Sequence, residues 1–399
     1  MSSRNAASHA ASNPASHVAS HAAMTAPQPV FAPLLLGGSP PLAVLREGAA
    51  LWVAEDGRAD GIVLSARLSE EEGLSVSDWC TGISSEAQPR AVLAALSGVF
   101  AHAPGMSAVR LVAPGLQPLA RAALRHSGVL SETGLCQRAA WAQQALLWLP
   151  HPVTAPASAA SEINTANTAN TANTANTANT ANAANAANAH NLLSADAPSS
   201  SALPSSQRPR PSGIVYTRDI PAFGHRFTLR TATLADDVEH LHAWMNEPRV
   251  NAFWGEAGPR LALQAYLTRV LATPHMHPLI GAFDGEPFGY FEGYWAIEDR
   301  IAPFAEPGTY DRGIHMLVGD TRWRGPRCVA AWLPSLLHYL FLDDPRTQAV
   351  FSEPRHDNDR MIGYMTQHGF TALHHFDFPH KRARLMRARR ADFFGGTHL

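Results

Sequence analysis

Cysteine is scarce in this sequence. The three cysteines, Cys80, Cys136 and Cys328, lie far apart, are odd in number and form no CxxC pair. Small secreted domains are held together by paired cysteines, and structural zinc sites use closely spaced ones. The cysteine pattern therefore excludes a disulfide framework and a zinc site of that type.

Long apolar runs and an excess of charge of one sign are also missing. No stretch approaches the ~18 apolar residues of a membrane helix, and residues 1–30 lack the continuous apolar segment of a secretory signal. Lys and Arg number 31 against 33 Asp and Glu, which gives a formal net charge of −2. We therefore expect a cytoplasmic protein without a nucleic-acid or membrane partner.

The chain divides by composition. Residues 1–30 are rich in Ala, Ser and His, and residues 151–213 contain Asn-Thr-Ala repeats without large apolar side chains. Neither segment can bury enough apolar surface to offset the entropy lost on ordering. We predict a disordered N-terminal segment, a small α/β domain at 31–150 with no assigned role, a disordered linker, and a second domain at 214–399.

In the second domain strands alternate with helices. A strand at 226–233 leads into a helix capped by Thr233, and the pair Asp284-Gly285 is typical of a hairpin turn. The complete order β-α-α-β-β-β-α-β-α-β-β indicates a mixed α/β sheet. Ligands of such sheets bind where a strand runs into a helix.

One such strand–helix junction reads DTRWRGPRC. Gly325 allows a close backbone approach, Pro326 suits a first helical turn, and the N–H groups of a helix start attract anions. Arg322, Arg324 and Arg327 add charged, bidentate donors. The junction therefore suits a diphosphate; the alternative is that the arginines only solvate a surface turn.

This junction resembles the coenzyme-A cradle of GNAT-superfamily acyltransferases, with R-x-x-G at Arg322–Gly325 but Arg327 in place of a small residue. Further segments resemble the siderophore acyltransferase branch, which includes aerobactin-type N6-hydroxylysine acetyltransferases and the mycobactin lysine N-acyltransferase. Between about Phe227 and Arg390 these segments are WMNEPRVNAFW, GYFEGYWAIEDRI, YDRGIHMLVG, EPRHDN, and HGF followed by FPHKRA. The resemblance implies a GNAT fold with a mixed, splayed sheet for 214–399.

The resemblance also implies site residues. Strand alternation puts His315 on the face opposite Ile314, and a lone strand histidine is more often a core residue than a catalyst. The resemblance nevertheless places His315 on the family's catalytic histidine and Asp357 on its partner acid. It further implies that backbone groups near Leu317 and Val318 bind the cofactor arm and stabilise the thioester oxyanion.

The implied reaction is direct transfer from acetyl-CoA or succinyl-CoA to a nitrogen, without a metal. For an amine, His315 acts as a base; for a hydroxylamine, it orients the nucleophile or takes the proton after attack. Asp357 either fixes the imidazole or holds the polar end of the substrate. Glu292 and Tyr294 share a strand face and are candidates for the acceptor pocket, the alternative being a half-exposed face with an aromatic cross-strand pair.

Three functions follow from these residues. The first is an acyl-CoA-dependent N-acyltransferase that acylates an N-hydroxylated lysine or diamine for a hydroxamate siderophore, with other siderophore-biosynthesis enzymes as possible partners. The second is N-acetylation of an aminoglycoside or polyamine, which predicts an acidic acceptor groove. The third is a non-catalytic acyl-CoA-binding scaffold, which should lack His315 and Asp357.

The first domain contains a segment similar in layout to the second. Residues 108–129 and 349–370 both run from a strand through a turn and a helix to a glycine, and Leu116 falls on the position of Asp357. One hypothesis is a degenerate copy of the GNAT half without its acid; the alternative is a common strand–helix unit repeated by chance.

Overall fold

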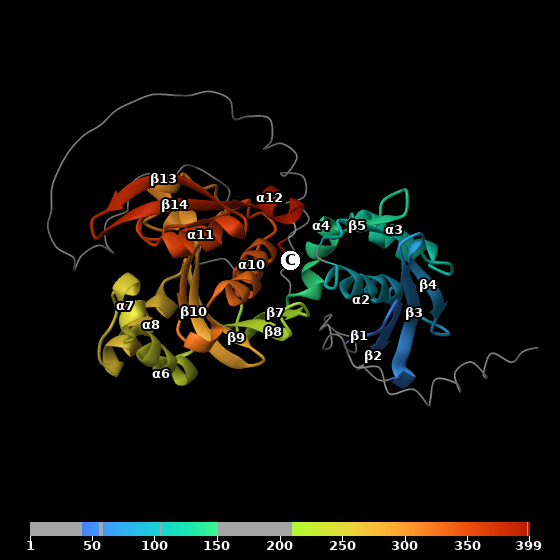
Figure 1. The fold of residues 1–399 in the computed structure, drawn as a ribbon, viewed down its shortest axis with the longest axis horizontal. Coiled ribbons are helices and arrows are strands. Elements are labelled where there is room, and N and C mark those ends of the chain that lie inside the picture. Colours follow the sequence, from blue (N-terminus) through green and yellow to red (C-terminus); the bar gives the residue numbers. More distant parts are fainter. Residues whose placement is uncertain (1–41, 56–58, 104, 151–209, 397) are drawn as a thin grey trace, which may run out of the picture.

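The computed structural model forms two β-sheets, each with helices packed against it (Figure 1). The predicted N-terminal segment and nearly all of the predicted linker lie outside the residues that it describes. These residues are 42–55, 59–103, 105–150, 210–396 and 398–399.

The N-terminal sheet has six strands in sequential order. Strands β1 to β4 are antiparallel, β5 runs parallel to β4, and β6 pairs antiparallel with β5. The elements are β1 (Leu42–Glu47), β2 (Ala50–Glu55), β3 (Ile62–Ser69), β4 (Gly73–Trp79), α2 (Ala87–Phe100), β5 (Ala108–Val112), α3 (Pro118–His126), β6 (Leu135–Gln137), α4 (Arg138–Ala142) and the short helix η3 (Ala145–Leu147).

The C-terminal sheet has eight strands in the order β13-β14-β12-β11-β10-β9-β8-β7. Its only parallel pair within the described residues joins β11 and β12, and the helix that follows β11 makes the crossover. The strands are β7 (Ile214–Ile220), β8 (His225–Thr231), β9 (Met276–Phe283), β10 (Glu286–Trp295), β11 (Arg312–Val318), β12 (Ala349–Ser352), β13 (Phe370–Phe378) and β14 (Lys381–Arg389).

Helices cover both faces of this sheet. Leu317 packs with the helices between β8 and β9, whereas Ile314 packs with the crossover helix, so the two faces of β11 follow the predicted alternation. His315 consequently faces the first group of helices. The helices are α6 (Leu234–Met245), α7 (Pro248–Trp254), α8 (Arg260–Ala272), α9 (Ala302–Ala305), α10 (Pro326–Asp343), α11 (Asp359–Gln367) and α12 (Arg390–Gly395). In the described part of the chain no helix is long and apolar enough to cross a membrane.

The predicted mixed α/β fold is confirmed, with four additional strands and α-helices in the second domain. The Thr233 side chain accepts the N–H of Asp236, as a helix cap should, and Asp284 and Gly285 form the turn between β9 and β10 with positive φ angles of 51° and 85°. The prediction omitted β7, α7, α9 and α12. Helices α7 and α12, with 7 and 6 residues, are too short to show a helical period.

Both parallel strand pairs form a fork. Strand β11 pairs with β12 only at Arg312–Val350 and Gly313–Phe351, and β4 pairs with β5 only at Leu74–Leu111 and Ser75–Val112. Beyond these pairs β11 continues over 314–318 and β4 over 76–79 with no strand of the described residues paired to that edge. The N-terminal domain thus has the strand–helix–strand tail on which the hypothesis of a degenerate copy depends; a common origin of the two domains stays a hypothesis.

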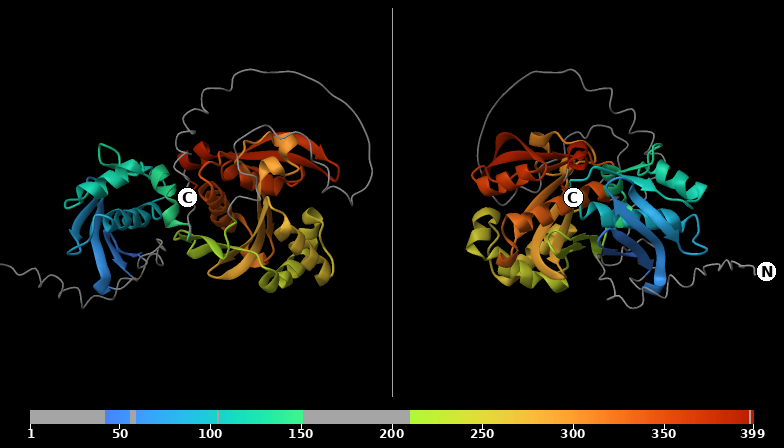
Figure 2. Two further views of the ribbon diagram at one scale, coloured as in Figure 1. Left: turned by 180° about the vertical axis from the view of Figure 1, so that it is seen from behind. Right: turned by 45° about the vertical axis from the view of Figure 1, so that its right-hand side comes forward.

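The two domains share an aromatic contact at α10. Figures 1 and 2 show them side by side, with the α4 end of the first domain facing the second. The buried His338 of α10 donates from Nε2 to the Ala142 carbonyl (2.7 Å) and accepts the Tyr216 hydroxyl at Nδ1 (2.9 Å). The ring of Trp148 lies 5.0 Å from that of His338, and the backbone carbonyl of Trp148 accepts the N–H of Thr217. One hydrophobic core therefore runs through both domains.

Candidate active site

His315 lies in the fork of the C-terminal sheet between two carboxylates. Its Nδ1 is 2.9 Å from Glu292 Oε2, and its Nε2 is 2.8 Å from Glu353 Oε1. Strand β10 supplies Glu292 directly opposite His315, and Glu353 is the first residue after β12. The histidine side chain is 19% exposed, but both carboxylates are buried. A ligand in the fork can therefore contact the imidazole, but the carboxylates of Glu292 and Glu353 are not accessible to it.

Buried tyrosines hold the two carboxylates. Tyr266 and Tyr290 donate their hydroxyls to Glu292 Oε1 at 2.5 and 2.8 Å, and Tyr294 donates to Glu353 Oε2 at 2.9 Å. Buried polar groups are stable only when such partners are present. The carboxylates are therefore fixed from behind as well as by the imidazole.

The electrostatics of this cluster favour the cationic form of His315. Burial disfavours the imidazolium, but the adjacent Glu353 and Glu292 carboxylates outweigh it and raise the pKa of His315 to about 10. Burial likewise opposes ionisation of the carboxylates, yet the contact with His315 holds the pKa of both Glu292 and Glu353 below the usual value. Lys381 adds a further positive charge, with its Nζ 3.7 Å from Glu353 Oε1.

The acids that hold the imidazole are Glu292 and Glu353, and not the predicted Asp357. Asp357 is exposed, and its carboxylate accepts Arg355 Nε at 2.5 Å. Both nitrogens of His315 are occupied by Glu292 and Glu353, so no ring nitrogen is left for Asp357. Its other suggested role, holding the polar end of a substrate, stays a prediction.

Glu292 and Tyr294 also have different surroundings from those expected. Neither alternative, a pocket-lining pair or a half-exposed face, describes them, because both are buried. Gly313 makes this possible for Tyr294, since a Cβ on that glycine would lie 2.0 Å from the tyrosine ring. The hydrogen bonds of Glu292 and Tyr294 hold the pair His315–Glu353, and their direct contact with a substrate stays a prediction.

The open edge of β11 presents different backbone groups from those predicted. The Gly319 N–H donates to the Phe288 carbonyl, so the alternation of an antiparallel pair turns the backbone of Leu317 toward β10. Met316 and Val318 therefore direct their backbone toward the fork. The set of candidate donors to a ligand becomes Met316 and Val318 in place of Leu317 and Val318.

Arg249 is a site residue that the sequence reasoning missed. From α7 it donates to the carbonyl of Val318 at 2.8 Å and to that of Gly319. It therefore fixes the end of β11 beside the open edge. The motif WMNEPRVNAFW contains this arginine, but nothing in its local pattern indicates that it reaches β11.

The arginines of the strand–helix junction point to different neighbours. Arg322 is 66% exposed and pairs with Asp320 (2.7 Å) and Glu286 (3.2 Å). Arg324 is exposed, and its charge helps to lower the pKa of Arg249, after the larger effect of burial. Arg327 lies over the ring of Phe223, 5.7 Å from its centroid. Their binding of a diphosphate stays a prediction.

Gly325 has a backbone that favours glycine. It is the N-cap of α10 with φ 102° and ψ 171°, and no atom lies within 4 Å of where a Cβ would be. Its conformation, rather than a lack of space, is what requires glycine. Among the residues that the structure describes, no group of His, Cys, Asp and Glu could hold a metal ion.

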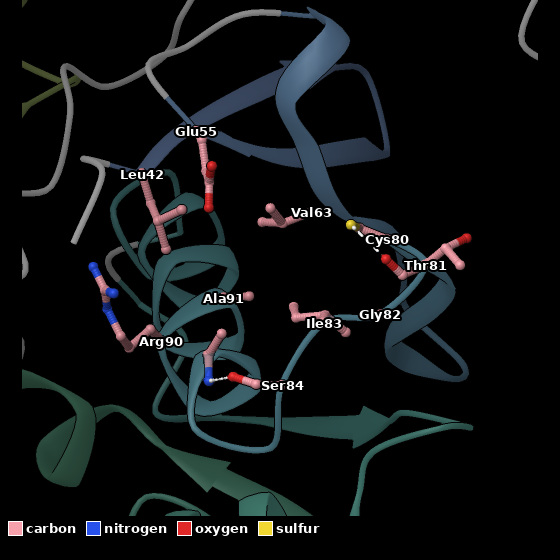
Figure 3. Close-up of a pocket in the computed structure, with 11 residues that line it drawn as sticks. Leu42, Glu55, Val63, Cys80, Thr81, Gly82, Ile83, Ser84, Arg90 and Ala91 are labelled. Carbon is pink, nitrogen blue, oxygen red and sulfur yellow. Dashed lines mark hydrogen bonds between the residues drawn. The ribbon is translucent and has the colours of Figure 1, made fainter.

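A pocket of about 320 Å³ lies beside the strand–helix junction of the N-terminal domain (Figure 3). Its charged lining residues are Glu55 and Arg90, and the lining contains no histidine. The junction itself, residues 80–86, reads CTGISSE and has no arginine or lysine. The strand–helix junction of the N-terminal domain thus lacks the cationic side chains of its C-terminal counterpart.

Comparison with known proteins agrees with this geometry. Residues 233–378 match the family model of the acetyltransferase (GNAT) domain. The C-terminal domain contains a GNAT domain. This confirms the fold expected from the resemblance.

Named relatives are similar over 47% of this chain. They are a provisionally named lysine N-acyltransferase of Schizosaccharomyces pombe (45% identical), an N6-hydroxylysine O-acetyltransferase of Escherichia coli (44%) and an N5-hydroxyornithine:cis-anhydromevalonyl coenzyme A N5-transacylase of Beauveria bassiana (42%). The matches cover 56%, 59% and 42% of these proteins, so the chain spans about half the length of the relatives it matches. The expected resemblance to N6-hydroxylysine acetyltransferases and related acyltransferases is confirmed.

Proposed function

We propose that this protein is an acyl-CoA-dependent N-acyltransferase that acylates an N-hydroxylated lysine or diamine to a hydroxamate. The observation that carries the proposal is the His315–Glu353 pair in the fork of a GNAT domain, beside the open edge of β11. The names of the E. coli and B. bassiana relatives, which describe acyl transfer involving hydroxylysine and hydroxyornithine, support the acceptor class.

The proposed reaction is a direct transfer. The acceptor nitrogen forms a bond to the thioester carbonyl carbon, the carbon–sulfur bond breaks, and the nitrogen proton ends on the departing thiol. Backbone N–H groups of Met316 and Val318 are placed to hold the thioester arm and to stabilise negative charge on its oxygen. His315, held at both nitrogens by Glu292 and Glu353 and 19% exposed, positions the acceptor through contact with its cationic ring.

The finer assignments are part of this proposal. Acetyl-CoA or succinyl-CoA is the co-substrate, bound with its diphosphate at Arg322, Arg324, Gly325 and Arg327. A cytoplasmic location and a role in iron acquisition also belong to the proposal. Other siderophore-biosynthesis enzymes are its proposed partners.

A thiol-release assay tests the proposal. Acetyl-CoA and succinyl-CoA are each combined with N6-hydroxylysine, N-hydroxyputrescine, or a polyamine or aminoglycoside control. We expect release only with a hydroxylamine acceptor, and about a 10²-fold or greater loss of kcat in His315→Ala with little change in CoA binding. Faster turnover of the polyamine or aminoglycoside would instead favour antibiotic or polyamine acetylation.

Asp357→Asn provides the matched comparison. Because Asp357 contacts Arg355 rather than His315, we expect its kcat loss to be much smaller than that of Glu353→Gln. An equal loss in both variants would restore Asp357 to the catalytic pair.

A further inference from the structure

The hydrogen bonds around His315 define where protons can lie. Two tyrosine hydroxyls point at Glu292 Oε1, which leaves that oxygen as an acceptor only. The remaining oxygen, Oε2, faces Nδ1 of His315. On the other side, Glu353 Oε2 accepts a hydroxyl from Tyr294, and Oε1 faces Nε2. This pattern is satisfied when both ring nitrogens carry a proton and both glutamates are ionised.

We propose that Glu292 is a positioning residue that keeps His315 protonated on both nitrogens, so that the site accepts only a nucleophile that arrives with a neutral nitrogen. This inference rests on the proposed acyl transfer and deepens it. In this proposal the buried carboxylate of Glu292 makes the site select a hydroxylamine over its parent amine, without contact between Glu292 and either acceptor.

The chemical reason lies in the two acceptors. A lysine-type amine has a pKa of about 10.4 and must lose a proton before it can attack. A histidine with both nitrogens donating has no lone pair to take that proton. A hydroxylamine is a weaker base, is neutral at pH 7 and needs no such step. After its attack the nitrogen proton goes to the departing thiolate, so no external base is consumed.

Groups from each neighbouring element support this protonation state. Glu292 comes from β10 and Glu353 follows β12. Lys381 of β14 and the tyrosine hydroxyls act on the carboxylates. The ring of Tyr294 also contacts the imidazole, 4.8 Å away. The Trp254 ring of α7 lies 6.4 Å from the imidazole at 85° and carries no charge. The more distant charges that act on the two glutamates are those of Arg300 and Glu256. The upward shift of the His315 pKa agrees in direction with this geometry.

The first test is spectroscopic and needs no substrate. The ring signals of His315 are followed by NMR across pH 5–11 in the full chain and are assigned by their loss in His315→Asn. We expect the native imidazole to titrate near pH 10, and Glu292→Gln to lower this midpoint, although Glu353 still raises the pKa of His315 in the variant. A native midpoint near 6.5 would overturn the inference.

The second test is the choice of acceptor. The kcat/KM ratio of N6-hydroxylysine over lysine is measured at pH 7.5 in the native protein and in Glu292→Gln. We expect this ratio to fall about tenfold or more in the variant, because a neutral imidazole then provides a base. An unchanged ratio, or a native protein that acylates lysine equally well, would refute the selection.

Two further variants keep the test decisive. Tyr266→Phe removes one of the two donors to Glu292 and should move both readouts in the same direction by a smaller amount, which covers the case that Glu292→Gln does not fold. Glu239→Gln, which alters an exposed glutamate paired with Arg260 on the surface, should change neither readout. If the native protein acylates no acceptor while His315 still titrates near pH 10, the proposed function fails but the protonation state stands.

Discussion

The two domains contain the same fork with different contents. In the C-terminal sheet the fork holds His315 and Glu353, and the junction beyond it carries arginines. In the N-terminal sheet β4 and β5 also share two residue pairs. Val112 takes the place of Glu353, four residues after Ala108 as Glu353 is after Ala349, and its partner on β4 is Ser75, which stands where His315 does in the C-terminal sheet. The backbone of a fork is therefore not sufficient for a site. The site depends on which side chains the fork positions.

A further question is what the N-terminal domain contributes to the protein. The contact at His338 and Trp148 gives one answer, because the N-terminal domain completes a core that includes α10, the helix that begins at the candidate cradle. In this interpretation the first domain supports the second by packing.

The largest expected effect is at the contact between the domains. Trp148→Ala removes a side chain that is 8% exposed and packs against His338 and Trp141. We expect it to lower the free energy of unfolding by about 3–5 kcal/mol, seen as one shifted transition for both domains in denaturant unfolding followed by circular dichroism. A second transition that keeps the native midpoint would mean that the domains are stable independently.

Leu119→Ala is the control for this experiment. Leu119 belongs to α3 of the same domain but is 74% exposed. Its removal should change the free energy of unfolding by less than about 0.5 kcal/mol. A large effect here would mean that the first domain contributes through a surface other than its contact with α10.

Sequence reasoning was most successful where the determinants are local. The Thr233 cap and the Asp284-Gly285 turn depend on neighbouring residues, and strand alternation correctly separated His315 from Ile314. The helix α7 and the strand β7 have no comparably strong local signal. Their positions are set by packing against the rest of the sheet.

The acid partner illustrates what local reasoning cannot supply. Glu353 and Asp357 occur in one motif, and the choice between them depends on where β12 ends relative to β11, with 38 residues between His315 and Glu353. The buried tyrosines of α8 and β10 that hold Glu292 depend on packing in the same way. A signal was available in hindsight, because Glu353 directly follows a strand parallel to that of His315.

A matched pair of glycines tests the two junctions at an intermediate scale. Gly325 (φ 102°) and Gly82 (φ 81°) occupy the strand–helix junctions of the two domains, and neither has an atom within 4 Å of a would-be Cβ. Alanine at either position should cost roughly 1–3 kcal/mol of backbone strain, measured by thermal unfolding. Only Gly325→Ala should also raise the KM for acyl-CoA, by about tenfold if one backbone donor to a phosphate is lost.

The outcome of this pair separates strain from function. Equal changes in KM would mean that strain alone disturbs the enzyme from either domain. No change in KM for Gly325→Ala, despite a loss of stability, would count against the junction of α10 as the diphosphate site. A raised KM for Gly82→Ala alone would move attention to the pocket of the first domain.

The smallest expected effect concerns Arg322, which has no counterpart in the junction at 80–86. Because its side chain is 66% exposed and already paired with Asp320 and Glu286, its net attraction for a phosphate should be modest. We expect Arg322→Ala to raise the acyl-CoA KM a few-fold at low salt and less at high salt, since exposed charges are screened. Arg389→Ala, which removes a similarly exposed arginine near Asp392, should leave KM unchanged. If both variants behave alike at both salt concentrations, Arg322 only solvates a turn, and the difference between the two junctions reduces to the backbone at Gly325.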